Sequence, residues 1–304
     1  MASENISIES CPICKGNYEI WAKKMTEYGE FIIVKCLKCG YAFVNPRPKL
    51  DFLMQFYSEI GHGPYGISDL SYELVLENEK QYPNSSLDAK RIINSSLKLL
   101  NAKYATQKKF LDIGCGYGFF SLEALKFGFE VTALELASTE RKIAEQMTGL
   151  KPVQKSFEDF QSEKSNFEVI LMSQILEHAH DVVEWIRKAH LLLKPNGILA
   201  IALPNFGSLF RLILKENEPY ICPPSHLNYF DQKSLAILLE NNGFEVCKVE
   251  YISRLPYSAV YKRLNKFGII FPRLIYCTIP LPLYIIDKLN LGSILNIYGR
   301  KLIT

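Results

Sequence analysis

A glycine-rich turn behind a short apolar run is the part of this sequence best suited to binding a ligand. Residues 110–113 are mostly apolar, glycine occupies every second position of Gly114–Gly118, and a helical pattern opens at Phe119. Such glycines let the backbone approach a ligand closely, and the following helix directs its unpaired N–H groups at that ligand. Glu135 ends the next apolar run, where a carboxylate can accept both hydroxyls of a ribose. The sequence therefore predicts a nucleoside-binding turn.

Two classes of ligand could use this turn. A dinucleotide-binding turn has the pattern G-x-G-x-x-G, and its third glycine would stand where this chain has Phe119. The chain has G-x-G-x-G instead, preceded by Asp112, and an acid beside the turn favours a ligand that carries an ammonium group. The pattern therefore favours a nucleoside with an amino-acid tail over NAD.

Two CxxC pairs near the N-terminus predict a metal site. Cys11 and Cys14 form the first pair, Cys36 and Cys39 form the second, and Gly40 supplies the positive φ that a knuckle often needs. Two such turns offer four thiolates in a tetrahedral arrangement, which is typical of a structural zinc ribbon with no ligand position left for substrate. The alternative, a redox-active dithiol, would need only one pair.

Two histidines are candidates for removing a proton from a substrate. His178 follows the apolar run 167–172, and His226 lies in a Pro-rich loop, so both would stand beyond the carboxyl ends of strands, where ligands bind in open α/β sheets. Each could equally hold its own loop in place by hydrogen bonding. In the insertion 206–222, Arg211 and Lys215 could bind an anionic acceptor or form a solvated helix face.

Strands and helices alternate through the central part of the chain, which predicts an α/β fold with a doubly wound sheet. We expect seven strands, at residues 109–113, 130–135, 152–154, 167–172, 198–203, 245–251 and 293–298. The predicted domains are a zinc ribbon at 1–48, a linker with lid helices at 49–107 and the α/β domain at 108–304, with an apolar insertion at 255–290.

The composition is that of a globular protein with a sizeable core. Of the 304 residues, 48% are hydrophobic and 22% are charged, and the net charge of +3 is too small to indicate nucleic-acid binding. The pattern of eight cysteines favours a reducing cytoplasm. Residues 262–290 combine basic flanks with an apolar stretch, which allows peripheral membrane contact, a hairpin packed on the protein or a dimer contact.

The stretch Leu111–Gly118 resembles the signature of class I S-adenosylmethionine-dependent methyltransferases. Three later segments, 173–178 (SQILEH), 192–198 (LLKPNGI) and 223–230 (PPSHLNYF), resemble motifs of the ubiquinone-methylase-like branch. The resemblance covers nearly the whole chain and implies a seven-stranded Rossmann-like sheet. It also implies S-adenosylmethionine as the cofactor, with zinc in the ribbon.

The resemblance implies a set of cofactor contacts along the carboxyl edge of the sheet. They are Asp112, Gly114, Cys115, Gly116, Gly118, Glu135, Leu136, Ser156, Phe157, Ser173 and Gln174. Ser156 stands where the family often has an acidic residue at the adenine edge. His226 and His178 are the candidate catalytic residues that follow from the same comparison of motifs.

Methyltransferases with a leading ribbon of this kind methylate sugars or other small molecules. The resemblance therefore implies a small-molecule acceptor, with a sugar or nucleotide sugar of polysaccharide biosynthesis as the leading hypothesis and no nucleic-acid partner expected. Methylation of a quinone-like or lipid-like molecule, of RNA or of protein is the alternative that shares the cofactor. A non-catalytic module whose ribbon binds nucleic acid or protein is the alternative of a different class.

Overall fold

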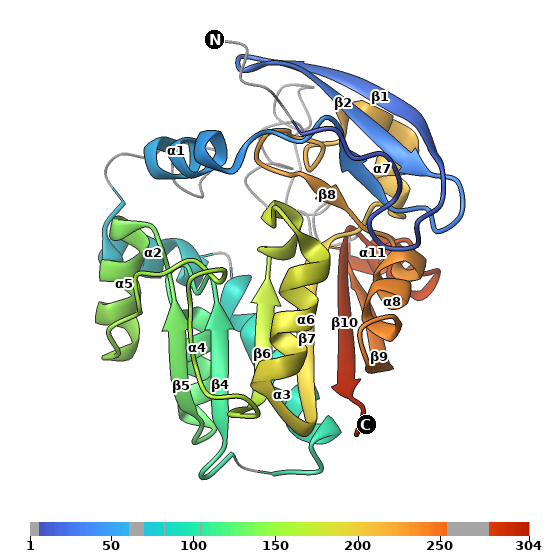
Figure 1. The fold of residues 1–304 in the computed structure, drawn as a ribbon. Coiled ribbons are helices and arrows are strands. Elements are labelled where there is room, and N and C mark those ends of the chain that lie inside the picture. The colour runs from blue at the N-terminus through green and yellow to red at the C-terminus, as the bar shows by residue number, and fades with distance from the viewer. Residues whose placement is uncertain (1–5, 61–69, 82, 104, 254–279, 304) are drawn as a thin grey trace.

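The computed structural model describes residues 6–60, 70–81, 83–103, 105–253 and 280–303, and within these ranges the main sheet has six strands (Figure 1). Their order is β5 (Glu130–Leu134), β4 (Lys109–Ile113), β6 (Phe167–Ser173), β7 (Leu193–Pro204), β10 (Ile294–Lys301) and β9 (Phe244–Ile252). The pairs from β5 to β7 are parallel, whereas β10 is antiparallel to both of its neighbours. The doubly wound α/β fold is confirmed.

The prediction of a seventh strand at residues 152–154 was wrong. Val153 forms only an isolated parallel bridge with Leu134, although its N–H still donates to the carbonyl oxygen of Ala133 at 2.8 Å. The carbonyl oxygen of Val153 also accepts the N–H of Glu135 at 3.1 Å, but the N–H of Lys155 donates back to Val153 at 3.0 Å, so the ladder does not continue beyond Val153. Within the described ranges the sheet therefore has six strands and one added bridge.

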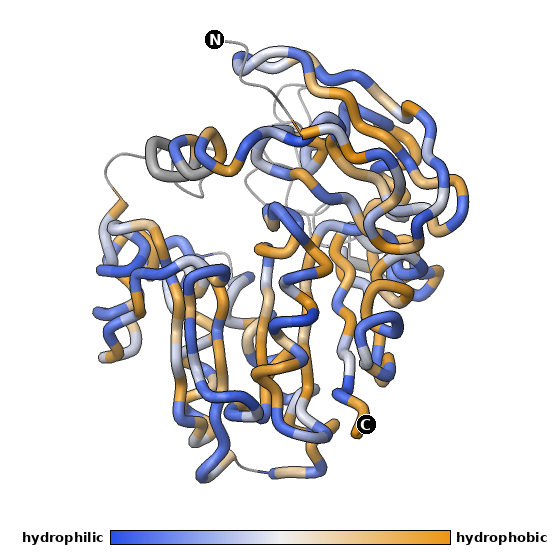
Figure 2. The backbone as a smooth tube through the Cα atoms, in the orientation of Figure 1, coloured by the Kyte–Doolittle hydropathy of each residue, from blue (hydrophilic) through white to orange (hydrophobic). Residues whose placement is uncertain are grey.

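The parallel strands are buried on both faces, and this explains their nearly continuous apolar sequences (Figure 2). One face of the sheet is covered by α3 (Ser85–Leu99) and α4 (Phe119–Lys126), and the other by α6 (Val182–Leu192) and α8 (Gln232–Glu240). Next to α4 lies α5 (Ser138–Thr148). Asp231 caps α8 in a capping box with Ser234, as expected for an acidic N-cap.

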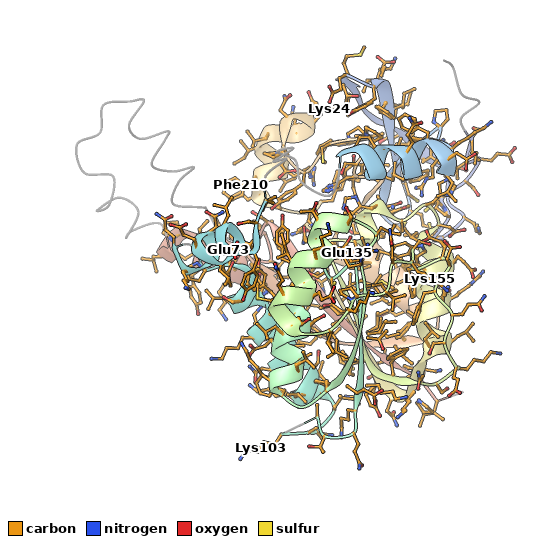
Figure 3. All side chains as sticks on the ribbon, turned by 90° about the vertical axis from the view of Figure 1, so that its left-hand side faces the viewer. Lys24, Glu73, Lys103, Glu135, Lys155 and Phe210 are labelled. Atoms are coloured by element: carbon orange, nitrogen blue, oxygen red, sulfur yellow. The ribbon has the colours of Figure 1, made fainter. Side chains whose placement is uncertain are left out.

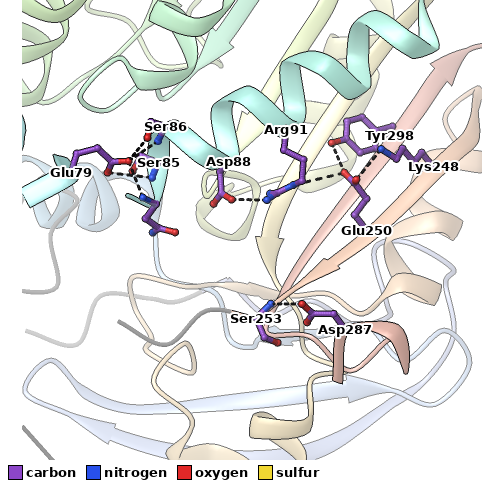
Figure 4. Close-up of polar contacts among 11 residues, drawn as sticks. Glu79, Ser85, Ser86, Asp88, Arg91, Lys248, Glu250, Ser253, Asp287 and Tyr298 are labelled. Carbon is purple, nitrogen blue, oxygen red and sulfur yellow. Dashed lines mark hydrogen bonds and ion pairs between the residues drawn. The ribbon is translucent and has the colours of Figure 1, made fainter. Parts of the chain in front are cut away.

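Charged side chains fasten α3 to the antiparallel edge of the sheet (Figure 4). Arg91 of α3 pairs with Asp88 at 2.7 Å and approaches Glu250 of β9 at 4.0 Å. Glu250 also accepts a hydrogen bond from the Tyr298 hydroxyl of β10 at 2.8 Å. At the start of α3, backbone N–H groups donate to the carboxylate of Glu79 from the preceding α2 (Tyr72–Gln81). These contacts are structural, and they connect α2, α3 and the antiparallel edge of the sheet.

A second, smaller sheet lies above the carboxyl ends of the main strands (Figure 1). It consists of β1 (Tyr18–Thr26), β2 (Gly29–Cys36), β3 (Ala42–Val44) and β8 (Asn228–Tyr229). The first three come from the predicted ribbon, but β8 belongs to the loop that carries His226. The predicted boundary at residue 48 remains a prediction, and the small sheet joins segments from both sides of it.

The remaining described elements complete the fold around the carboxyl ends of the parallel strands. They are α1 (Leu50–Ile60), η1 (Leu176–His178), α7 (Leu209–Leu214), η2 (Lys215–Asn217) and α11 (Pro280–Lys288). Among the helices that the structure describes, none is long and apolar enough to cross a membrane. Most of the 262–290 segment, for which the sequence allows membrane contact, lies outside the described residues, as do residues 61–69 of the predicted linker and lid segment.

Candidate active site

The glycine turn after β4 has the backbone conformation that its sequence predicts. Gly114, Gly116 and Gly118 have φ values of +67°, +54° and +85°, which are left-handed conformations that other residues rarely adopt. A Cβ atom added at Gly114 would lie 2.9 Å from Cδ1 of Ile175. All three positions therefore favour glycine because of their backbone conformation. At Gly114 an added Cβ atom would also crowd the Ile175 side chain.

Glu135 lies directly after β5, at the end of the sheet that faces α1 (Figure 3). Its Oε2 accepts the N–H of Gly116 at 2.9 Å, and its Oε1 accepts the N–H of Ala137 at 2.9 Å. These two bonds fix the carboxylate against the glycine turn. Each carboxylate oxygen has a second lone pair, so the group can also accept the two hydroxyls of a ribose.

Asp112 lies beneath the turn rather than in the wall of a cavity. Its side chain is buried, and its Oδ2 accepts the hydroxyl of Ser121 at 2.6 Å. Burial raises the pKa of this carboxyl to about 7. The contact ties the first turns of α4 to the end of β4, so Asp112 supports the turn from below. A direct contact between Asp112 and a ligand remains a prediction.

A cavity of about 660 Å³, open space at its mouth included, lies over the ends of β4, β5 and β6. Of the predicted site residues, it is lined by Gly114, Glu135, Leu136, Ser156, Phe157 and His178. The remaining predicted residues, Asp112, Cys115, Gly116, Gly118, Ser173, Gln174 and His226, are not in its lining. Leu50 and Leu53 of α1, which lies in the predicted linker and lid segment, contribute to the wall, although the sequence did not single them out as site residues.

An acid, Glu158, stands two positions beyond Ser156, the residue that we predict at the adenine edge. The Ser156 hydroxyl donates to Asp159 at 2.8 Å and thereby closes a local turn. Glu158 lines the cavity, where its Oε1 accepts the indole N–H of Trp185 at 2.8 Å. The sequence contained a signal for Glu158, because an acid follows Phe157 directly, two positions after Ser156.

Gln174 connects β6 to the next part of the site. It has a φ of +54°, which is uncommon for a residue with a side chain, and its N–H donates to the carbonyl oxygen of Ala202 at 2.7 Å. This sharp turn ends β6 and leads directly into η1, which carries Glu177 and His178. Strained backbone of this kind is concentrated at functional sites.

Three polar side chains come together beyond the end of β6. One oxygen or nitrogen from each of Glu177, His178 and His226 lies within 4.8 Å of the others. The two imidazole rings meet edge to face with centroids 4.8 Å apart. The structure thus brings together the two histidines that the sequence proposed, although they lie on different segments.

Backbone carbonyls fix the tautomers of both imidazoles. Nδ1 of His178 lies 2.7 Å from the carbonyl oxygen of Ser225, and Nδ1 of His226 lies 2.8 Å from that of Tyr220. Because a carbonyl only accepts, Nδ1 carries the proton in each ring. Burial lowers the pKa of His226 to about 4, so its imidazole is neutral at physiological pH.

Glu177 is the member of this cluster that sequence reasoning missed. Glu177 is 2% exposed, and neither of its carboxylate oxygens has a hydrogen-bond partner within the described ranges. Burial raises the pKa of this carboxyl to about 8. A buried acid without a partner is costly, and it is therefore a candidate for function. The available signal was its place beside His178, directly after a buried strand.

Arg211 does not have the environment of an anion-binding side chain. Its Nε donates to the carbonyl oxygen of Phe206, and its guanidinium lies over the Phe206 ring at 4.4 Å from the centroid. Lys215 ends the same short helix as its C-cap. Arg211 therefore holds the insertion 206–222 in place.

The four N-terminal cysteines form a cluster whose geometry fits zinc. The Sγ atoms of Cys11 and Cys39 are 3.6 Å apart, those of Cys14 and Cys36 are 3.4 Å apart, and all four lie within 4.8 Å of one another. These separations are far from the length of a disulfide bond. They are close to the edge of about 3.8 Å that Zn–S bonds of 2.3 Å give in a tetrahedron. The hydrogen bond with Cys39 lowers the pKa of the Cys11 thiol below its ordinary value.

We expect the purified protein to contain one zinc ion per chain, measured by elemental analysis. Cys39→Ser should remove the zinc and lower the melting temperature, because a structural zinc site contributes its binding free energy to folding. Cys247→Ser is the matched control, since Cys247 lies in β9 outside the cluster. A wild-type protein that contains no zinc under reducing conditions would refute the assignment.

Comparison with known proteins agrees with the fold and the turn. The sequence model of the family described as "Methyltransferase domain" matches residues 87–249, which is more than half of the chain. The ubiquinone biosynthesis O-methyltransferase of Histophilus somni (strain 2336) is 33% identical over 155 residues, covering 43% of this chain and 65% of that protein. The chain thus spans just under two thirds of the curated relatives that it matches first.

Solved structures share the fold at low sequence identity. The 1,6-didemethyltoxoflavin-N1-methyltransferase of Burkholderia thailandensis, with bound S-adenosylhomocysteine, has a TM-score of 0.50 and 16% identity over 88% of this chain and 98% of its own. A chain from the Haloferax volcanii complex of the Trm112 methyltransferase activator with a methyltransferase has a TM-score of 0.53 and 13% identity, covering 77% of this chain and 95% of its own. The family match, the six described strands and the glycine turn with Glu135 together show that the chain belongs to the methyltransferase domain family.

Proposed function

We propose that this protein transfers a methyl group from S-adenosylmethionine to a hydroxyl group of a small molecule. The observation that carries the proposal is the arrangement of the Gly114–Gly118 turn and Glu135 at the ends of adjacent parallel strands, beside a cavity that Gly114 and Glu135 line. Membership of the methyltransferase domain family supports it.

The residues of the cavity suit the parts of this cofactor. Glu135 can accept the ribose hydroxyls, Leu136 and Phe157 offer apolar surface to the adenine, and the Gly114–Gly118 turn allows close backbone approach. When bound, S-adenosylmethionine supplies a methyl group that its sulfonium already makes electrophilic. The protein therefore has to position the acceptor and exclude water.

A hydroxyl acceptor must also lose its proton, and Glu177 is the residue best suited to take it. A general base works best when its pKa lies near the operating pH. Burial brings the pKa of Glu177 to about 8 but lowers that of His226 to about 4, which makes the imidazole a weak base. We assign proton acceptance to Glu177, whose ionised carboxylate becomes neutral when it takes the proton of the acceptor hydroxyl. His178 and His226, our candidate catalytic residues from sequence, then hold the acceptor.

The acceptor is a small molecule in this proposal, and two classes can be separated by assay. The sequence resemblance favours a sugar or nucleotide sugar, but the comparisons do not support one. The curated relatives are named for ubiquinone biosynthesis, which favours the quinone-like alternative. A cytoplasmic location remains our prediction, based on the unpaired state of the described cysteines.

Calorimetry is expected to show one S-adenosylmethionine bound per chain. S-adenosylhomocysteine should then form when the loaded protein is incubated with the correct acceptor. Nucleotide sugars and hydroxylated quinone precursors form the two arms of the acceptor panel. Absence of any cofactor binding by the zinc-replete protein would overturn the proposed function.

A further inference from the structure

We propose that Asn228 is the positioning residue through which the N-terminal ribbon holds the acceptor side of the active site. The inference rests on the methyl transfer proposed above and concerns the loop Leu176–Ala179, which carries Glu177 and His178. Asn228 lies in β8, the strand that the main domain contributes to the small sheet (Figure 1). Its side chain contacts the ribbon on one side and this loop on the other.

The ribbon side supplies hydrogen-bond donors. The hydroxyl of Tyr41 donates to Oδ1 of Asn228, and Nη2 of Arg47 donates to the same oxygen at 2.9 Å. Tyr41 directly follows the second cysteine knuckle, and its carbonyl oxygen accepts the N–H of Cys36 at 2.8 Å. The hydrogen bonds thus run from a predicted zinc ligand to Asn228 through one residue.

The loop side supplies acceptors only. Nδ2 of Asn228 donates to the carbonyl oxygens of Leu176, Glu177 and Ala179 at 3.3, 3.2 and 2.8 Å. Donors on one side and acceptors on the other fix the orientation of the amide, because a flipped amide would oppose like groups on both sides. Asn228 is 1% exposed, so water cannot replace these bonds.

Backbone and guanidinium contacts run parallel to the amide. Val44 of β3 donates its N–H to the carbonyl oxygen of Leu227, whose own N–H donates to the carbonyl oxygen of Glu177, both at 2.9 Å. Nη1 of Arg47 donates to the carbonyl oxygens of Ala179 and His180. The ribbon therefore contacts the backbone after His178 directly, through Arg47, and is linked to the backbone before His178 through Leu227.

The cofactor side has different supports. Glu135 is held by N–H groups of Gly116 and Ala137, and Asp112 is held by Ser121. The clamp at Asn228 should therefore affect the acceptor step and leave cofactor affinity unchanged. This split distinguishes positioning from a general contribution to folding.

Asn228→Asp is the sharpest test, because the aspartate keeps Oδ1 as an acceptor for Arg47 but replaces the Nδ2 donor with an oxygen that faces three carbonyl oxygens. We expect kcat/KM for the acceptor to fall by about 100-fold, since small displacements of catalytic groups have effects of that size. The Kd for S-adenosylmethionine should stay within about twofold of the wild type. Tyr41→Phe removes one bond from the opposite side, and it should give a smaller loss of the same kind. The two losses should not add in the double variant.

Lys233→Ala is the matched control. Its Nζ donates to the carbonyl oxygen of Lys38 at 3.1 Å, so it also joins the ribbon to the main domain, but through α8. This variant should keep the wild-type kcat/KM. An equal loss in Lys233→Ala would show that the ribbon acts only through overall stability, and this would overturn the proposal.

Hydrogen exchange tests the clamp independently of turnover. The amide proton of Leu227, bonded to Glu177, should exchange at least about tenfold faster in Asn228→Asp and Tyr41→Phe, while the amide of Gly116 should not change. This readout needs neither acceptor nor cofactor, so it separates failure of the clamp from failure of the proposed methyl transfer. Unchanged exchange at Leu227 in both variants would overturn the clamp even if the protein is a methyltransferase.

Discussion

Glu135→Ala is expected to lower the affinity for S-adenosylmethionine by about 100-fold or more, measured by calorimetry. The change removes the carboxylate that can accept two ribose hydroxyls, and each hydrogen bond to a charged group contributes about 1.5–3 kcal/mol. It also leaves the N–H groups of Gly116 and Ala137 without the acceptor that shapes the turn. Cofactor binding should fall before any effect on the acceptor is seen.

Glu130→Ala is the control for this result. Glu130 lies on the same strand but at its other end, and its side chain is exposed. This variant should bind the cofactor as the wild type does. The double variant Asp112→Ala/Glu135→Ala should abolish binding, because it also removes the support beneath the turn. A folded Glu135→Ala protein with wild-type affinity would contradict our assignment of the nucleoside site.

Glu177→Gln is expected to lower kcat by about 10²- to 10⁴-fold, the usual range for loss of a general base. Glutamine has nearly the same shape but cannot accept the proton of the acceptor hydroxyl. Cofactor affinity should not change, because Glu177 does not line the cofactor cavity. Steady-state kinetics with the acceptor identified by the panel provides the measurement.

The proposed role of Glu177 also predicts the direction in which the rate changes with pH. Glu177 must be ionised to act as a base, so the wild-type rate should rise with pH up to its pKa of about 8. The rise should be absent in Glu177→Gln. His226→Ala should lower the rate and keep the rise, because the pKa of His226 is already about 4 and its imidazole does not titrate in this range.

The stability of the protein should also depend on the protonation of the Glu177 carboxyl. Its pKa is raised from 4.5 to about 8 on folding, so the folded chain retains a proton that the unfolded chain loses. The contribution of this group to stability is complete below pH 4.5 and is lost as the pH rises toward 8. The melting temperature of the wild type should therefore fall relative to that of Glu177→Gln between pH 5 and pH 9. A constant difference across this range would contradict the raised pKa.

Local patterns in the sequence determined the fold class and the nucleoside turn. The alternation of apolar strands and amphipathic helices predicted the doubly wound sheet, and the strand at Lys109–Ile113 was predicted to the residue. The glycines at positions 114, 116 and 118 predicted a turn that lets the backbone approach a ligand closely, and in the structure all three have the positive φ that glycine adopts readily. The four cysteines were equally informative, since ligand spacing within a knuckle is short-range.

The tertiary structure alone decided which distant residues share a site. Glu177 was missed in the sequence, and only the structure shows it buried beside His178 and His226, without a hydrogen-bond partner among the described residues and with a raised pKa. Desolvation depends on everything packed around a group, so no sequence window can show it. The seventh strand failed for a similar reason, because a strand exists only where a neighbour completes its ladder.

The N-terminal ribbon shows most clearly the difference between what the sequence predicts and what only the tertiary structure decides. Its cysteines predicted a metal site by themselves, but they did not indicate what the site supports. That answer depends on Asn228, which lies far along the chain and joins Tyr41 and Arg47 to the loop of Glu177. Hydrogen bonds between segments so distant in sequence form only when both segments are folded, so the role that we propose for the ribbon follows from the packing and not from any motif.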